Sequence, residues 1–352
     1  MDGRALTTDA AGRRSRQLAA GVIAAGATLL AGLIVLAGEN PLRVLGLLVQ
    51  GAFLTPAGLA DSIVRMIPLC LMGFGVALAF RARIFNIGAE GQFLIGAATG
   101  AALAAPLAGL PGALALPVLL AAGAVGGAIW GAVAGVLRAR FNASEIIATI
   151  LLNHIAFNVL SWLIRGPLQE SAGVFPRTDR LPAELRLPLL IDGTRISAGL
   201  VVVLVAVVLM WVLMARSRFG FQIAALGENP EAARYGGVAP GMVTIAGLAI
   251  SGGLAGLAGI VELSGVHGRI QDGFGAGLGI TAIAVALLAR LNPLWVPVSA
   301  LGFAGLHVGS ATVARATAVP FPLVNIIEGT IIVAFLAAGL LARAERGRPS
   351  GG

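Results

Sequence analysis

Lysine is missing from this chain of 352 residues, because all 24 of its basic residues are arginines. A Walker A loop needs a lysine on the nucleotide phosphates, and a Schiff-base enzyme needs a lysine nucleophile. The sequence also lacks the HExxH signature of zinc proteases and the GxSxG elbow of serine hydrolases. Its three histidines, His154, His267 and His307, have no metal-ligand spacing. We therefore expect no ATPase site, catalytic residue, metal or cofactor in this chain.

Cysteine and charged residues are also scarce. The single cysteine, Cys70, cannot form an intrachain disulfide and is expected to be a packed structural thiol. Charged residues make up 11% of the chain, hydrophobic residues make up 58%, and the mean hydropathy is +0.94. So few polar residues cannot coat a soluble domain, and the chain is expected to be an integral membrane protein. Fifty glycines predict closely packed helices, with a repeat every fourth residue at Gly123, Gly127, Gly131 and Gly135.

The apolar segments predict an all-α, polytopic transmembrane helix bundle of about ten spans. A cytoplasmic tail at 1–17 precedes a single transmembrane domain at 18–341, and a second cytoplasmic tail follows at 342–352. The segment 44–60 is amphipathic and is expected to lie in the interface or to re-enter. The predicted spans are about 18–38, 62–80, 93–110, 113–137, 146–164, 197–214, 242–265, 275–290, 294–311 and 322–341.

The net charge of +8 would suggest a nucleic-acid partner in a soluble protein. Here most arginines cluster at the ends of apolar segments, which is the positive-inside pattern, so we expect lipid and not nucleic acid around the chain. This pattern places both termini in the cytoplasm. It also places the loop 215–241 in the cytoplasm and the loop 165–196, with its mixed charges, on the extracytoplasmic side.

Within the loop 215–241 the sequence predicts a short helix with its own caps. Asn229 is a good N-cap, Pro230 suits the first helical position, and Glu231 faces the positive end of the helix dipole. Arg234 lies near the other end, and Gly236–Gly237 can form a left-handed C-cap. A helix of about two turns is unstable alone. The segment is therefore either a docking helix or a turn that connects two spans.

A second polar segment, Asn86-Ile87-Gly88-Ala89-Glu90-Gly91-Gln92, separates two apolar segments. The two glycines, Gly88 and Gly91, would let the backbone unwind, and Asn86, Glu90 and Gln92 would then line a cavity. The alternative is a cytoplasmic turn, because Arg81 and Arg83 precede it. Polar residues inside or beside spans are costly and are candidates for a polar path or for hydrogen bonds between helices. They are Glu145, Asn153, His154, Asn158, Glu262 and Glu328.

Four segments together resemble a known family. They are FRARIFNIGAEGQFLIGA (80–97), EIIATILLNHIA (145–156), GENPEAARYGGV (227–238) and GITAIAVALLARLNP (279–293). They resemble the permease subunits of ABC importers for nucleosides and simple sugars, within the wider group of ribose and branched-chain amino acid permeases. The resemblance covers most of the chain, from residue 60 to residue 340.

The resemblance implies a transport subunit in a bacterial inner membrane that has no enzyme activity of its own. ATP and Mg²⁺ would belong to a cytoplasmic ATP-binding subunit. A second, homologous permease subunit would complete a heterodimer, and an extracytoplasmic binding protein would deliver the substrate. Ala232 and Ala233 would allow close approach to the ATP-binding subunit. The residues expected at that contact are Gly227, Asn229, Pro230, Glu231, Ala232, Ala233, Arg234, Tyr235 and Gly236.

The expected translocation path contains Asn86, Gly88, Glu90, Gly91, Gln92 and Asn153. The expected substrate is a nucleoside or a related small polar solute. A simple sugar of the ribose or galactose type is the alternative, and an ion-coupled carrier that runs without ATP is a further one. Aromatic residues form only 5% of the chain and do not identify a nucleobase site.

Overall fold

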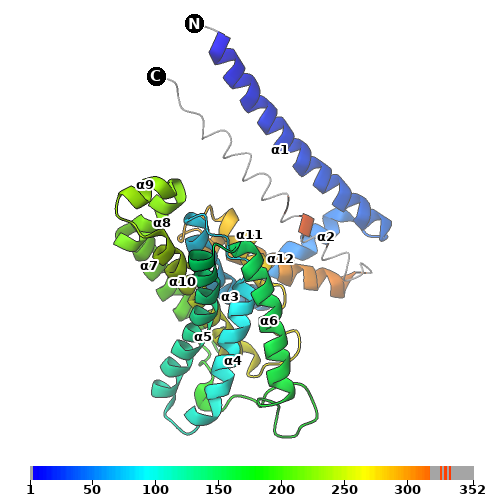
Figure 1. The fold of residues 1–352 in the computed structure, drawn as a ribbon. Helices are drawn as coiled ribbons and strands as arrows, with labels where there is room; N and C mark the ends of the chain where they lie inside the picture. The colour runs from blue at the N-terminus through cyan, green and yellow to red at the C-terminus, as the bar shows by residue number, and fades with distance from the viewer. Residues whose placement is uncertain (1–2, 318–325, 327–328, 331–332, 334–352) are drawn as a thin grey trace. The chain divides into compact units, whose positions relative to one another are not determined.

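The computed structural model describes residues 3–317, 326, 329–330 and 333 (Figure 1). The span predicted at 322–341, with Glu328, lies almost wholly outside these residues, and the tail at 342–352 lies entirely outside them. The chain divides into two compact units. One contains residues 1–62 together with 305–352, and the other contains residues 63–304.

The first unit begins with α1 (Gly3–Leu36) and α2 (Pro41–Val49), followed by a π-helix (Gln50–Leu54). Asn40 caps α2 by accepting a hydrogen bond from the Leu42 N–H at 2.9 Å. The segments Ile23–Leu36 and Pro41–Leu54 are bent by 104° relative to each other, as in a broken span or a re-entrant loop. The predicted amphipathic segment at 44–60 therefore covers most of the second arm of this bend and the start of the next helix.

The second unit contains the helices that position the candidate site. They are α3 (Pro56–Arg81), which starts in the first unit, α4 (Ala89–Leu107), α5 (Gly112–Phe141), α6 (Glu145–Arg165), α7 (Gly199–Arg216), α8 (Arg218–Glu228), α9 (Pro230–Tyr235), α10 (Pro240–Glu262) with a π-helix (Leu263–His267), α11 (Leu278–Leu288), and α12 (Val296–Ala316), which continues into the first unit. The pair α8–α9 lies at the opposite end of this unit from the loop that joins α6 to α7 (Figure 1).

Six of the described helices are long and apolar enough to cross a bilayer, or seven if the bent pair in the first unit is one span. The prediction of an all-α, multi-span membrane protein is confirmed. Two predicted spans differ from this pattern. Glu90 and Gln92 make the first turn of α4 polar, and α11 has only 11 residues where a span was predicted at 275–290.

The centre of the second unit is built on glycine contacts between α5 and α10. A Cβ atom added to Gly127 would lie 2.2 Å from the Gly252 carbonyl oxygen, and one added to Gly131 would lie 2.3 Å from the Leu248 carbonyl oxygen. Helix α4 also packs on α10, because a Cβ at Gly96 would lie 2.2 Å from the Gly256 Cα. The predicted close packing by small residues is confirmed.

Candidate functional site

Helix α3 ends at Arg81, and the chain then turns back so that Asn86 lies against Ser251, near the middle of α10. The Asn86 side-chain amide donates to the Ser251 hydroxyl at 2.8 Å and to the side-chain oxygen (Oε1) of Gln92 at 2.9 Å. The Gln92 amide donates back to Asn86 Oδ1 at 3.1 Å. Asn86 is 0% exposed and Gln92 is 1% exposed. These three buried side chains therefore satisfy one another and fix the junction between α3 and α4.

Asn153 holds the same junction from α6. Its side-chain oxygen accepts from the Gly91 N–H at 2.8 Å, and its amide donates to the Ile87 carbonyl at 2.8 Å. The structure thus brings Asn153 together with the predicted polar segment. Thr149, a residue that sequence reasoning missed, lies beside it and accepts from the Ile87 N–H at 3.3 Å.

Only one of the two glycines of the polar segment lies where the helical backbone is interrupted, as predicted. Gly88 is the N-cap of α4, and Gly91 lies inside that helix, so the predicted unwinding at Gly91 is wrong. Both glycines instead permit close approach of α6. A Cβ at Gly91 would lie 2.8 Å from Asn153 Oδ1, and a Cβ at Gly88 would lie 3.0 Å from the Thr149 Cβ. The break in helical structure lies earlier, at 82–88.

A second interruption of the helical backbone, at 268–277, faces the one at 82–88. After the π-helix that ends α10, residues 268–277 are not helical, and Gly268, Gly273, Gly275 and Gly277 all have positive φ. The segment passes α4, because a Cβ at Gly275 would lie 2.2 Å from the Phe93 ring. Helix α11 then begins, and its 11 residues extend about 16 Å, against roughly 30 Å for a bilayer core. The predicted span 275–290 is therefore only partly helical.

Glu90 joins the two breaks. Its carboxylate accepts a hydrogen bond at 3.0 Å from the N–H of Gly277, the N-cap of α11. Glu90 also lies in the first turn of α4, so the positive ends of two helix dipoles stabilise its negative charge. Gly279 lets the helices meet, since a Cβ there would lie 2.6 Å from the Glu90 Cβ. Glu90 remains partly exposed, unlike Asn86 and Gln92.

The glycine-rich segment is anchored at its other end to the long loop after α6. Arg165, the last residue of α6, forms a salt bridge with Asp272 at 2.6 Å, and the Thr178 hydroxyl accepts from the Ile270 N–H at 3.0 Å. His267 Nδ1 lies 3.3 Å from a Glu262 carboxylate oxygen. Sequence reasoning missed the Arg165–Asp272 pair, although the glycine spacing at 268–277 was a usable signal of a broken span.

Two carboxylates in the loop between α6 and α7 are fixed by donors within the loop. A hydrogen bond from the Arg177 guanidinium lowers the pKa of Glu170 below its usual value. Hydrogen bonds from the Ser171 hydroxyl and backbone N–H lower the pKa of Asp179 in the same way. Glu170 and Asp179 therefore stay ionised to a lower pH than free carboxyl groups do.

The capped helix predicted in the loop 215–241 is present as α9. The Asn229 side chain accepts from the N–H groups of Glu231 at 3.0 Å and Ala232 at 3.1 Å, and Pro230 occupies the first helical position. Gly236 is the C-cap, and Gly237 adopts the left-handed conformation with φ of 83°. Helix α8, which was not predicted, precedes it.

One side of α9 packs against the rest of the chain, and its other side is exposed. Ala233 is 5% exposed and packs within this chain, whereas its neighbour Ala232 is exposed. The outward side chains are those of Pro230, Glu231, Ala232, Arg234 and Tyr235, and Tyr235 is 94% exposed.

Gly227 belongs to α8 and not to the α9 helix. A Cβ at this position would lie 2.1 Å from the carbonyl oxygen of Arg81. The end of α8 therefore rests directly on the end of α3, next to the junction that contains Asn86.

This geometry defines a class of protein: a multi-span helical membrane protein with two facing breaks in its bundle and a short capped helix at one end. The family model of the branched-chain amino acid transport system / permease component matches residues 58–342, most of the chain. The chain therefore belongs to this family and is a permease subunit of an ABC importer, a transport component and not an enzyme.

Relatives with assigned names agree with the family. The chain is 36% identical to the glucose ABC transporter permease protein TsgB13 of Haloferax volcanii, over 86% of this chain and 82% of the relative. It is 32% identical to the guanosine ABC transporter permease protein NupP of Bacillus subtilis, over 82% and 83%. It is 29% identical to the nucleoside ABC transporter permease protein NupB of Lactococcus lactis, over 90% and 91%.

Proposed function

We propose that this permease subunit carries a nucleoside or a related small polar solute through a bacterial cell membrane. The observation that carries this proposal is the family match over residues 58–342, together with relatives named for guanosine and nucleoside transport. A simple sugar is the second candidate, favoured by the 36% identical relative named for glucose. Competition of unlabelled guanosine, ribose and glucose against labelled guanosine, in vesicles that contain the whole transporter, separates the two candidates.

The translocation path in this proposal passes Glu90 and the start of α11. Non-helical backbone within a membrane is tolerated where it is buried in protein or lines a polar cavity, and discontinuous helices mark substrate sites in many transporters. Glu90 is the ionisable group at the meeting point of the two breaks and is partly exposed. Asn86, Gln92 and Asn153 support this point by fixing the α3–α4 junction.

A second permease subunit completes the path along α6. His154 and Asn158 are exposed on a helix whose neighbouring exposed residues are apolar, including Leu151 (55%) and Ile155 (49%). Polar side chains that face lipid are costly, so a protein or aqueous surface is the expected neighbour. A homologous but different chain, giving a heterodimer, is the expected partner. Cross-linking from His154→Cys to the partner permease tests this contact.

The ATP-binding subunit docks on the outward face of α9, where Tyr235 is exposed and both ends of the helix carry matched charges. ATP and Mg²⁺ would be held by that subunit, and a substrate-binding protein would dock at the opposite end.

The proposal includes about ten spans and cytoplasmic termini, which cysteine labelling from each side of the membrane tests.

The energy source separates this mechanism from that of an ion-coupled carrier. Uptake is expected to require ATP hydrolysis by the partner and to survive collapse of the proton gradient while ATP is held constant. Uptake by this chain alone in liposomes, driven by an imposed ion gradient, would contradict the proposal.

A further inference from the structure

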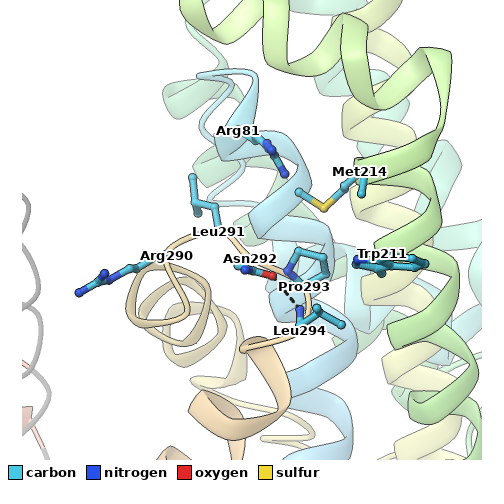
Figure 2. Close-up of a pocket in the computed structure, with 9 residues that line it drawn as sticks. Arg81, Trp211, Met214, Arg290, Leu291, Asn292, Pro293 and Leu294 are labelled. Atoms are coloured by element: carbon cyan, nitrogen blue, oxygen red, sulfur yellow. Dashed lines mark hydrogen bonds between the residues drawn. The ribbon is translucent and has the colours of Figure 1, made fainter. Parts of the chain in front are cut away.

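A cavity of about 450 Å³ lies between the end of α3, the end of α7 and the loop that joins α11 to α12. Figure 2 shows Arg81 above it, Trp211 and Met214 on one side, and the loop residues on the other. Its lining residues are Arg81, Trp211, Met214, Ala215, Arg290, Leu291, Asn292, Pro293 and Leu294. All of them belong to the second unit, and the translocation path described above uses none of them.

The loop has an unusual backbone that shapes the cavity. Arg290 and Leu291 are consecutive non-glycine residues with positive φ, 54° and 56°. Asn292 Oδ1 then accepts from the Leu294 N–H at 3.0 Å and fixes the turn. As a result, Pro293 lies opposite Trp211, while the Arg290 side chain extends away from the cavity (Figure 2). The wall formed by Trp211, Met214 and Pro293 is apolar.

The charge around this apolar wall is positive. The Arg81 guanidinium extends toward Met214 over the cavity (Figure 2), and the Arg216 guanidinium lies 5.5 Å from the centre of the Trp211 ring. None of the described residues that line the cavity is acidic. Among the described residues, no carboxylate forms an ion pair with Arg81 or Arg216. An anion with an apolar portion complements this combination of groups.

We propose that this cavity binds an anionic glycerophospholipid of the surrounding bilayer. The Arg81 and Arg216 guanidinium groups would bind the lipid phosphate, and Trp211, Met214 and Leu294 would contact the first part of the acyl chains. A bilayer lipid is the occupant that fits the place, because α3 and α7 are membrane-spanning candidates that end here with arginines. Basic pockets between spans at the cytoplasmic side suit anionic headgroups. Trp and Arg at the ends of spans suit the membrane interface.

The test measures lipid retention by the full-length chain purified with its partner subunits. The complex is stripped of lipid, titrated with phosphatidylglycerol or with phosphatidylcholine of the same acyl chains, and examined by native mass spectrometry. Wild type should retain phosphatidylglycerol in preference to phosphatidylcholine. Arg81→Gln should bind phosphatidylglycerol roughly five-fold more weakly, as expected for one arginine near an anionic headgroup. Arg216→Gln tests the second proposed phosphate ligand, which does not line the cavity but lies over the ring of the lining residue Trp211.

Arg140→Gln is the matched control, because Arg140 is an exposed arginine in the last turn of α5 and does not line the cavity. It should retain phosphatidylglycerol like wild type. Equal retention of the two lipids, or unchanged retention in both Arg81→Gln and Arg216→Gln, overturns the proposal. If soluble glycerol 3-phosphate, at the same concentration as the lipid, displaced phosphatidylglycerol, the cavity would be a site for a free phosphate compound, and the lipid proposal would be overturned. Lipid binding only after removal of the ATP-binding subunit would also overturn it, since that subunit would then fill the cavity.

Discussion

Glu90 and Gly277 lie 187 residues apart in the sequence, and the Glu90 carboxylate accepts a hydrogen bond from the Gly277 N–H at 3.0 Å. This contact joins the first turn of α4 to the N-cap of α11. It therefore connects the two places where the helical bundle is interrupted, and it leaves a carboxylate partly exposed at their meeting point.

The first prediction concerns this contact. Glu90→Gln should reduce substrate uptake about ten-fold or more while the complex still assembles, because a hydrogen bond to a charged group contributes about 1.5–3 kcal/mol. The measurement is uptake by reconstituted complexes, with subunit recovery as the assembly check. Glu145→Gln, which removes another carboxylate at the start of a helix, is the control and should transport normally. Wild-type uptake by Glu90→Gln would remove Glu90 from the path.

The second prediction concerns Asn86, for which the structure indicates a structural role. Asn86→Leu should lower thermal stability, because it leaves the buried polar groups of Gln92 and Ser251 without a hydrogen-bond partner. Each buried polar group that loses its partner costs about 1–3 kcal/mol of stability. Asn158→Leu is the control, since the exposed Asn158 bonds only to the backbone of its own helix. Thermal unfolding of the isolated, solubilised permease gives the comparison, because the proposed partner contact of Asn158 is then absent from both variants. A fully stable but inactive Asn86→Leu would instead support a direct role in the path.

The third prediction separates the two faces of α9. Tyr235→Ala should leave the permease folded but reduce recovery of the ATP-binding subunit and its substrate-stimulated ATPase activity, because an exposed aromatic side chain is lost from the docking face. Ala233→Glu should destabilise the loop 215–241 itself, since a buried, unpaired carboxylate is costly. Asn229→Ala should cost about 1 kcal/mol through loss of the cap.

Limited proteolysis of the isolated permease distinguishes these variants. Ala233→Glu should be cleaved faster in this loop, and Tyr235→Ala should match wild type. Normal recovery of the ATP-binding subunit by Tyr235→Ala would place the docking face elsewhere.

The fourth prediction concerns Gly227. Gly227→Ala would place a Cβ 2.1 Å from the Arg81 carbonyl oxygen, so α8 must move away from the end of α3. We expect substrate-stimulated ATPase activity to fall while basal ATPase activity and subunit recovery persist, because α9 would then be displaced from the junction. Gly241→Ala is the control, as its Cβ would meet only the Ala139 Cβ at an ordinary 3.4 Å. Equal stimulation in both variants would show that this contact is not needed for coupling.

Local sequence determined the features that depend on neighbouring residues alone. Asn229, Pro230 and Gly237 specify both ends of α9, because a cap needs only a side chain or a backbone conformation within a few residues. Hydropathy likewise determined the membrane class, since apolar segments must avoid water wherever they pack.

Tertiary structure decided the features that depend on distant contacts. Asn86 bonds to Ser251 across 165 residues, and this contact buries a side chain that was expected to line a cavity. The burial of Ala233 depends on which side of α9 packs against the rest of the chain. The local sequence does not indicate this side, because Ala232 and Ala233 are identical residues next to each other. The late start of α11 follows from the packing of the glycine segment against Phe93 and Glu90. Hydropathy does not register this start, because an apolar segment has the same composition whether or not its backbone is helical.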